Sequence, residues 1–476
     1  MAKLRPLMLS LLVTLLAPTL ALAAGGHHPT IPGPELSAVW VIPFACMLLS
    51  IAIMPLAIPH IWHHHFGKIA VFWGLAFLVP CFIVYGAQVA IYELLHALLL
   101  EYVPFIVLLF ALFTVAGGVR LKGSLVGTPV VNTGILAVGT VLASWMGTTG
   151  AAMLLIRPLL RANAHRRYRV HSVVFFIFLV ANIGGSLTPL GDPPLFLGFL
   201  KGVSFFWTTT HLFLKTLLMV VALLAIFFVL DNVLYKKEGS PVPAVDPDAP
   251  KEKLGLDGSI NLFFLLLIVG AVLVSGLLQL GPAITIYGVT MEGQNLLQVI
   301  SLLAIAGLSW AFTSKQCREL NEFSWAPIEE VAKLFLGIFI SMIPAIAILR
   351  AGTDGALSGV INMVFHDGQP VNAMFFWLTG MLSSFLDNAP TYLVFFNTAG
   401  GDAARLMTDM ATTLAAISAG AVFMGANTYI GNAPNFMVRS IAEERGVAMP
   451  SFFGYMMWSV GILVPLFIIL TFIFFI

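Results

Sequence analysis

Long apolar runs are the feature of this sequence that most constrains its fold. Runs of about 20 apolar residues recur along the chain, for example at 69–92 and 452–475, and a helix of that length spans the hydrocarbon core of a bilayer. Hydrophobic residues make up 59% of the 476 residues and charged residues only 9%, too few charges to cover a soluble protein of this size. The sequence therefore predicts an all-α polytopic membrane protein.

The same composition argues against several other classes of protein. Basic residues are few and dispersed, so no nucleic acid is expected as a partner. Cys46, Cys81 and Cys317 lie far apart and match no disulfide framework or metal-binding spacing. The chain lacks the HExxH and GxSxG motifs of hydrolytic enzymes. We therefore expect a non-enzyme without a cofactor, embedded in a lipid bilayer.

The first 24 residues have the pattern of a secretory signal peptide. Lys3 and Arg5 precede an apolar stretch that ends in Ala21-Leu22-Ala23, a small-x-small cleavage site. An uncleaved first helix is the alternative. Both interpretations indicate a bacterial inner membrane protein whose mature N-terminus and C-terminus lie in the periplasm.

The apolar runs follow the same order in two halves of the chain. Helices are expected at 36–58, 69–92, 103–119, 211–234, 260–281, 296–314, 334–352 and 452–475, and interrupted segments at 123–160, 170–206, 371–400 and 409–445. A segment rich in Pro, Asp and Lys at 235–259 is typical of a solvated linker, here between repeat 1 (25–234) and repeat 2 (260–476). With these helices, sixteen of the 23 lysines and arginines lie in predicted cytoplasmic segments and three in predicted outer segments, as the positive-inside rule requires.

Two of the interrupted segments are predicted to be re-entrant hairpins. Segments 123–160 and 371–400 turn at "ASWMGTTG" (143–150) and "SSFLDNAPT" (383–391), and their arms are short for a full crossing. The charges on their flanks indicate that the first hairpin enters from the cytoplasm and the second from outside. Two tight full crossings in each segment are the alternative.

An offset of 240 residues relates the two halves. Ser144 is matched by Ser384, and "TPLGDPPLF" (188–196) is matched by "TYIGNAPNF" (428–436). Each half is predicted to cross the membrane five times, so the second copy must be inverted relative to the first. Inverted repeats with broken helices are typical of secondary transporters, whose site lies near the bilayer midplane between the repeats.

The other two interrupted segments are predicted to be broken helices. "GGSLTPLGDPP" (184–194) and "GANTYIGNAP" (425–434) place glycines and prolines inside apolar runs, and free carbonyls at membrane depth are costly unless they face a cavity or a ligand. We therefore expect the hairpin tips and the breaks to converge on one site, whose hard oxygen ligands suit Na⁺. The candidate ligands are Ser144, Thr148, Thr149, Asn182, Ser186, Thr188 and Asp192 in the first half and Ser384, Asp387, Asn388, Thr391, Asn427, Thr428, Asn432 and Asn435 in the second.

Asp192 and Asp387 are the strongest candidates for binding Na⁺. An ionisable side chain inside the bilayer is expensive and indicates function. A carboxylate that takes either H⁺ or Na⁺, but not both, is sufficient for antiport. The alternative is that each aspartate caps the helix that follows it.

Three other polar groups have simpler interpretations. The histidines of "HIWHHHFGK" (60–68) lie in a predicted cytoplasmic loop, where an interfacial anchor is favoured over a metal site. Arg157 is expected either to extend to the membrane surface or to pair with a substrate carboxylate. Glu93, His96 and Glu101 fit a short outer loop.

The motifs at the hairpins and breaks resemble those of the ion transporter superfamily. That group includes NhaD-type sodium/proton antiporters, CitMHS-type citrate transporters, arsenite pump membrane subunits and divalent anion/sodium symporters. "SSFLDNAPT" resembles the hairpin tip of the antiporter and citrate branches, and "LGDPP" (190–194) resembles the break of the antiporter and arsenite branches. "VPFIVLLFALFTVAGGV" (103–119) resembles the helix before their first hairpin.

The resemblance implies ligands in both halves, with two departures. It implies Ser384, Asp387, Asn388 and Thr391 in the second hairpin, and Asp192 and Asn432 in the breaks. In the first hairpin, Gly147 and Thr148 stand where the second has Asp387 and Asn388. Leu195 follows "DPP" where the family pattern has asparagine, while Asn435 holds that place in the second half. These departures leave open whether the protein has one cation site or two.

Together these features predict a secondary active transporter that works by alternating access. The first hypothesis is a sodium/proton antiporter in which Asp387 and Asp192 exchange H⁺ and Na⁺. The alternative is a sodium- or proton-coupled symporter for a di- or tricarboxylate such as citrate, held by neutral hairpin tips and half-helix N-termini. A homodimer is common in the families that the sequence resembles.

Overall fold

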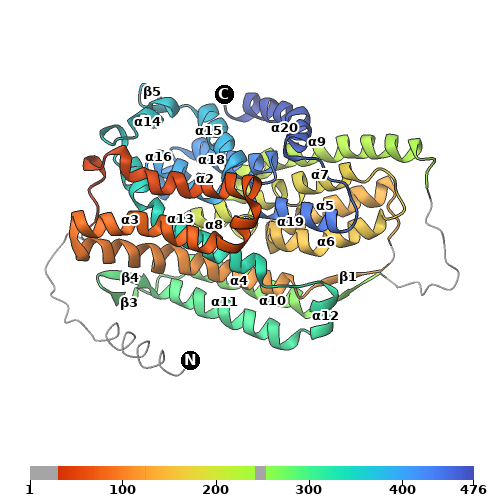
Figure 1. Ribbon diagram of the computed structural model, residues 1–476, viewed down its shortest axis with the longest axis horizontal. Helices are drawn as coiled ribbons and strands as arrows, with labels where there is room; N and C mark the ends of the chain where they lie inside the picture. The colour runs from red at the N-terminus through yellow and green to blue at the C-terminus, as the bar shows by residue number, and fades with distance from the viewer. Residues whose placement is uncertain (1–29, 124, 242–253) are drawn as a thin grey trace.

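The computed structural model describes residues 30–123, 125–241 and 254–476, and these form an almost wholly helical protein (Figure 1). Nine helical segments among them are long and apolar enough to cross a membrane. This confirms the prediction of an all-α polytopic membrane protein. The predicted signal peptide (1–24) and the middle of the predicted linker lie outside the described residues.

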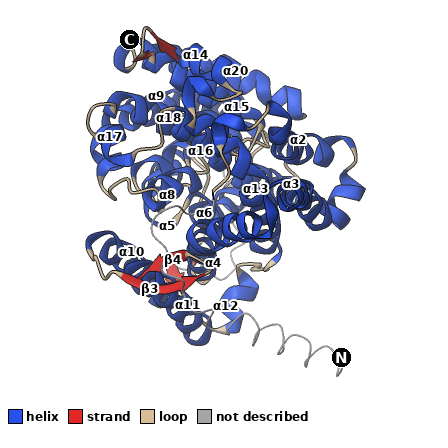
Figure 2. Cartoon of the chain, turned by 90° about the vertical axis from the view of Figure 1, so that its left-hand side faces the viewer, coloured by secondary structure: helices blue, strands red, loops and turns tan. Residues whose placement is uncertain are grey.

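Six long helices pack into one group, which we call the framework. They are α2 (Ile42–Ala57), α3 (Pro59–His96), α4 (Val103–Ala116), α10 (Ile260–Leu277), α11 (Gly293–Phe312) and α13 (Ala326–Arg350). Helix α3 packs against α2 and α13, and α11 packs against α4 and α10. The short helices η1 (Gly33–Glu35), η2 (Ala38–Val41) and α12 (Lys315–Leu320) attach to this group. In Figure 2, α4, α10 and α11 lie together at one end of the molecule.

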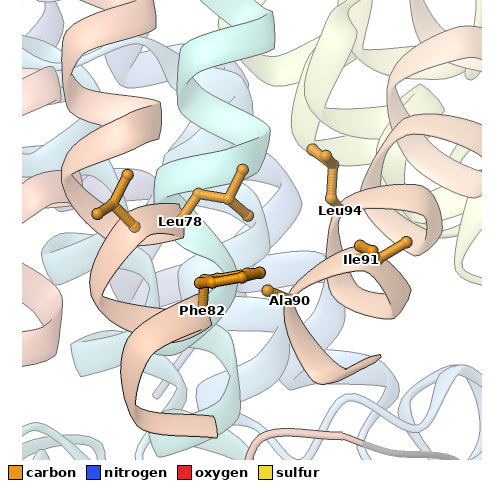
Figure 3. Close-up of a pocket in the computed structure, with 6 residues that line it drawn as sticks. Leu78, Phe82, Ala90, Ile91 and Leu94 are labelled. Atoms are coloured by element: carbon orange, nitrogen blue, oxygen red, sulfur yellow. The ribbon is translucent and has the colours of Figure 1, made fainter. Parts of the chain in front are cut away.

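Helix α3 is two arms joined at Gly86, where φ is 85° and ψ is 169°. Figure 3 shows Leu78 and Phe82 on one arm facing Ala90, Ile91 and Leu94 on the other, across a small apolar pocket. The second arm continues through one π-helical segment, η3 (Ala97–Tyr102), into α4. The chain therefore reverses at a glycine, because only glycine adopts this conformation without strain.

Two predictions about this part of the chain were wrong. Glu93, His96 and Glu101 lie on helical backbone after the Gly86 turn, not in an outer loop. The stretch 60–68 is also helical, because α3 begins at Pro59, a residue suited to the first position of a helix. Its histidines form no metal-binding cluster with other His, Cys, Asp or Glu side chains among the described residues.

The two hairpins and the two broken helices form a second group, which we call the hairpin core. The hairpins are α5 (Pro129–Met146) with α6 (Thr148–Ala162), and α15 (Asn372–Phe385) with α16 (Asn388–Thr398). The broken helices are α7 (Val170–Leu179), η4 (Ile183–Leu187) and α8 (Pro193–Leu200), and α18 (Ala411–Met424), η6 (Gly425–Asn427) and α19 (Ala433–Glu444). Within Val170–Leu187, 89% of the residues are buried, so this broken helix lies at the centre of the protein.

Helices α9 (Trp207–Lys237) and α20 (Phe452–Phe474) flank the hairpin core. Only 28% of their most apolar stretches is buried inside the protein, so most of that surface is available to lipid. The open end of the first hairpin lies near the C-terminal end of α9, since Arg166 contacts Asp231 and Glu238. The chain after the second hairpin lies at the other end of α9, where Trp207 Nε1 donates to the Met407 carbonyl. This arrangement supports opposed hairpins, while the inversion of whole repeats remains a prediction.

Short elements that the sequence analysis missed complete the fold. They are β1 (Arg120–Lys122) with β2 (Gly255–Asp257), β3 (Pro282–Ile286) with β4 (Val289–Glu292), β5 (Phe365–His366) with β6 (Gln369–Pro370), η5 (Gly352–Asp354), α14 (Ser358–Val364) and α17 (Ala403–Met407). The antiparallel β1–β2 pair fastens the end of the linker to the chain after α4. Lys122 Nζ and Arg120 Nη1 contact the Asp257 carboxylate at 2.7 and 3.1 Å. The hydrogen bond from Lys122, with the charges of both residues, lowers the pKa of Asp257.

Candidate functional site

Asp192 is the point at which all four predicted segments meet. Its Oδ1 accepts hydrogen bonds from Thr148 Oγ1 and Asn432 Nδ2, each at 3.1 Å. Its Oδ2 accepts a hydrogen bond from Asn388 Nδ2 at 2.5 Å. Thr148 belongs to the first hairpin tip, Asn388 to the second, and Asp192 and Asn432 to the two breaks. The structure therefore brings the tips and breaks together around one carboxylate.

The local backbone explains why the Asp192 side chain is free for these contacts. Asp192 occupies the N-cap position of α8, with φ −142° and ψ 141°, yet its side chain makes no capping bond. Pro193 follows at the first helical position, where it has no N–H to be satisfied. The carboxylate is thus directed away from its own helix, toward Thr148 in the first hairpin tip and toward Asn388 and Asn432 in the second half.

The surroundings of Asp192 are buried and carry no positive side chain in contact with it. Asp192, Thr148, Asn388 and Asn432 are each at most 2% exposed. Among the ion pairs of the described residues, none includes Asp192. A buried ionised carboxylate without a cationic partner is costly, and neutral donors offset only part of that cost. Such a group is suited to take up a proton or a metal cation.

Two buried amide oxygens, one at the second hairpin tip and one at the second break, have no hydrogen-bond partner among the described residues. They are Oδ1 of Asn388 and Oδ1 of Asn427. Asn427 is held by its other amide atom, since its Nδ2 donates to Ser384 Oγ at 2.9 Å. Amide oxygens are hard ligands that suit Na⁺. The Asp192 carboxylate and the free Oδ1 of Asn388, whose Nδ2 contacts Asp192, are therefore the neighbouring groups that could hold a cation.

Asp387 has a different environment from Asp192. Its side chain is half-buried, and its Oδ1 accepts a hydrogen bond from the Ala389 N–H at 3.0 Å, which caps α16. Thr391 Oγ1 donates back to the Asp387 carbonyl at 3.0 Å. The capping alternative therefore describes Asp387 and does not describe Asp192. Through this cap, Asp387 fixes the helix turn that carries Asn388.

Four of the predicted ligands fasten the hairpin tips to the breaks. Thr188 Oγ1 donates to the Ser144 carbonyl, and Thr428 Oγ1 donates to the Ser384 carbonyl. Ser144 Oγ donates to the carbonyl of residue 184 at 2.5 Å, and Ser384 Oγ donates to that of residue 424 at 3.1 Å. Each bond of the first half recurs 240 residues later, which supports the proposed duplication.

Asn182 and Asn435 join the two breaks to each other. Asn182 Nδ2 donates to Asn435 Oδ1 at 2.7 Å, and Asn432 Nδ2 donates to Asn182 Oδ1 at 3.2 Å. Asn435 Nδ2 also donates to the Thr428 carbonyl at 2.9 Å. Asn435 thus links the two breaks by hydrogen bonds. Its counterpart in the first half, Leu195, has no polar group and cannot form such a link.

Helices α9 and α20 supply polar partners that the sequence analysis did not single out. Thr216 bonds to Ser186, with 2.7 Å between their hydroxyl oxygens. Tyr455 OH donates to the Ala426 carbonyl at 2.9 Å, and Ser459 Oγ donates to the Asn427 carbonyl at 2.7 Å. Single hydroxyls on long apolar helices give no sequence signal for this role. Thr149, the remaining candidate, lies half-buried in the first turn of α6.

Arg157 pairs with a side chain of the protein itself. Its Nε forms an ion pair with Glu322 Oε2 at 3.0 Å, and Glu322 also pairs with Arg445. The sequence could not show this contact, because Arg157 and Glu322 are 165 positions apart. Arg157 is therefore held by the protein itself, through a glutamate whose side chain is 45% exposed.

The fold and the site thus define a multi-pass membrane protein with a buried polar centre between two hairpins. A family model described as "Putative citrate transport" matches residues 33–475. Because the match spans nearly the whole chain, the protein belongs to this family, a CitMHS-like branch of the ion transporter superfamily. No curated protein matches the chain.

Proposed function

We propose that the protein is a secondary active transporter in which Asp192 binds either H⁺ or Na⁺, and that it exchanges the two ions across the membrane. The observation that carries this proposal is the buried Asp192 carboxylate, surrounded by neutral donors from both halves and by no cationic side chain in contact with it. A group in this position is stable when it is protonated or when it binds a cation. Occupancy by one ion excludes the other, and this exclusion couples their movements.

The proposed binding steps use groups that are already in place. With Na⁺ bound, the ionised Asp192 and the Asn388 amide oxygen would supply ligands. With H⁺ bound, one carboxyl oxygen becomes a donor, and the Asn388 amide can turn so that its free Oδ1 accepts from it. Since these groups belong to both halves, the occupant of the site influences how the halves sit against each other. Alternating access follows if the two occupied forms favour different arrangements.

In this proposal Asp387 is a positioning residue. Its carboxylate caps α16 through the Ala389 N–H, whereas the Asp192 carboxylate binds donors from both hairpin tips and from the second break, so we assign the exchange to Asp192. This revises the initial hypothesis, which gave both aspartates the same role.

Coupled transport of citrate or a related carboxylate is the second candidate function. The family match supports it, and so do the N-termini of α16 and α19 at the centre, because helix N-termini favour anions. Against it stands the acidic centre of the site. In this alternative Asp192 would carry the coupling H⁺ or Na⁺, and the substrate would bind beside it.

We also propose a bacterial inner membrane location in which the open end of the first hairpin faces the cytoplasm. Arginines and lysines concentrate at that end, as the positive-inside rule expects. They are Arg161, Arg166, Arg167, Arg169, Lys236, Lys237, Arg439 and Arg445. The C-terminus would then be periplasmic. A homodimer remains a prediction from the resemblance.

The test uses inside-out vesicles from a host without its own sodium/proton antiporters. A pH gradient is established, Na⁺, Li⁺ or citrate is added, and a pH-sensitive dye reports proton movement. Dissipation by Na⁺ or Li⁺ that is lost in Asp192→Asn would support antiport. Asp402→Asn is the matched control, because Asp402 caps an exposed short helix. No response to the cations, together with sodium- or proton-driven uptake of labelled citrate in right-side-out vesicles, would favour the symporter.

A further inference from the structure

Each half-helix that begins at the site ends in a cation tied to the framework. Helix α8 has Asp192 at its N-cap and Lys201 at its C-cap, and α19 has Asn432 at its N-cap and Arg445 at its C-cap. Lys201 Nζ forms an ion pair with the Glu101 carboxylate on η3, in the framework. Arg445 Nη2 forms an ion pair with Glu322, between α12 and α13 of the framework.

The second arms of the hairpins also bind the framework through polar side chains. We call these contacts, together with the Lys201–Glu101 and Arg445–Glu322 pairs, the ties. On α6, Arg157 Nε pairs with Glu322 at 3.0 Å. The position 240 residues later is Asn397 on α16, whose Oδ1 accepts a hydrogen bond at 2.7 Å from Nε of Arg350, the last residue of α13. Equivalent positions of the two hairpins are thus bound to the framework at opposite ends of the protein.

These polar ties interrupt a boundary that is otherwise largely apolar. Elsewhere α4 meets α8 through Phe105 and Phe196, whose ring centroids are 6.4 Å apart. Each ion pair adds an attraction between two particular side chains, and this attraction falls when the two move apart. The side chains of Lys201 and Glu101 are 17% and 16% exposed, and partly buried pairs contribute more than exposed ones. At the other end the side chains of the Arg445–Glu322 pair are 46% and 45% exposed, so the pair of Glu322 with Arg157, whose side chain is 10% exposed, carries more of that tie. The ties therefore fix where the hairpin core sits on the framework.

We propose that Glu101 and Glu322 are positioning residues for transport, each closing one end of the pathway by binding the hairpin core to the framework. This inference rests on the proposed alternating access. In the described conformation both ties are formed and the Asp192 cluster is at most 2% exposed, so both ends are closed. Opening one end requires release of its glutamate while the other remains bound.

The connection between site and tie is a single rigid element. Helix α8 spans eight residues from the Asp192 cap to Lys201, and α19 spans twelve from the Asn432 cap to Arg445. A shift of either N-cap when the Asp192 site changes its occupant therefore displaces the cation at the far end of the same helix. Release of a tie is in this way linked to the ion bound at the centre.

The test measures from which side the centre can be reached, and it does not need transport. In a chain whose three native cysteines are replaced by serine, Thr149→Cys or Leu386→Cys reports access to a hairpin tip. A membrane-impermeant methanethiosulfonate reagent is added to right-side-out or inside-out vesicles. Glu101→Gln should raise the labelling rate about tenfold from one side only, and Glu322→Gln about tenfold from the opposite side, the effect of a ~1.4 kcal/mol change in bias.

Matched controls break ion pairs that lie within one helix. Glu443→Gln removes the Arg439 pair inside α19, and Glu329→Gln removes the Lys333 pair inside α13, so neither should alter labelling from either side. Exchange of the charges, by Glu101→Lys together with Lys201→Glu, should restore the low labelling rate. Should Glu101→Gln fail to insert, Lys201→Gln tests the same tie. Should Glu322→Gln fail to insert, Arg157→Gln together with Arg445→Gln tests its tie, because both arginines pair with Glu322.

Labelling that rises from the same side in both variants, or in neither, would overturn the inference. A side-specific effect in a protein that shows neither ion exchange nor citrate uptake would retain the ties and reject the proposed function. Ion exchange without a side-specific effect would reject the ties and retain the function. The two failures are therefore distinguishable.

Discussion

Replacement of Asp192 by asparagine should abolish ion coupling and leave the fold intact. The carboxylate accepts three side-chain hydrogen bonds, and each charge-assisted bond exceeds a neutral one by about 1 kcal/mol. Making all of them neutral therefore costs ~3 kcal/mol. The substitution also removes a buried charge without a cationic partner, and that desolvation penalty is several kcal/mol in the opposite direction.

The two contributions nearly cancel, so the free energy of unfolding should change by no more than ~2 kcal/mol. One local conflict arises, because the new amide N–H₂ faces Asn388 Nδ2. It is relieved if the Asn388 amide turns and presents its Oδ1, which has no other partner. Thermal unfolding of the purified variant and dye-reported exchange in vesicles measure the two effects separately. Retained sodium-driven proton movement, or a protein that no longer folds, would refute this reasoning.

Three further outcomes are expected. Asp387→Asn should keep substantial transport, because asparagine is also a good N-cap, whereas Asp387→Ala should lose about 1 kcal/mol of stability and most transport activity. Thermal unfolding and vesicle exchange would measure the two effects. An equal loss of transport in the two variants would mean that the carboxylate itself is required. Replacing Pro193 and Pro194 together by alanine should let the break close partly into helix and slow transport, and unchanged rates would show that the break is not functional. Asp257→Asn should lower the free energy of unfolding at neutral pH by less than about 1 kcal/mol. Because Lys122 and Arg120 lower the pKa of Asp257 in the folded protein, the wild type should keep its full advantage above the ordinary pKa of 3.8 and lose it as the pH falls through the lower pKa of the folded state. Denaturation at several pH values would test this.

The interruptions of the membrane helices could be predicted from the sequence. Glycines and prolines inside apolar runs mark the hairpin tip at Gly147 and the breaks at 184–194 and 425–434, because these residues disfavour continuous helix wherever they fall. The sequence also predicted that the two hairpin tips and the two breaks meet, since polar backbone groups at membrane depth must find partners. These predictions needed only local chemistry and the length of the runs.

The different hydrogen bonding of the two aspartates could not be predicted. Asp192 and Asp387 both precede a helix, and whether such a residue caps it depends on side-chain geometry that neither motif specifies. Asp387 bonds to the Ala389 N–H, while the Asp192 carboxylate turns away toward Thr148. The sequence therefore drew attention to both aspartates without distinguishing their surroundings.

Contacts between segments that are far apart in the chain could not be predicted from the sequence either. Glu322 meets Arg157 across 165 positions, and only the packing of the hairpin core on the framework brings them together. The reversal at Gly86 was missed for a related reason. Polar residues at 93, 96 and 101 suggested a loop, but on helical backbone one of them, Glu101, finds Lys201.

The most direct test of the central claim is proton release on addition of Na⁺ to the purified protein in weakly buffered solution. If Asp192 takes either ion, each Na⁺ bound should displace a proton, and Asp192→Asn should release none while Asp402→Asn behaves as the wild type. Proton release that persists in Asp192→Asn would show that exchange occurs at another group and would contradict the account.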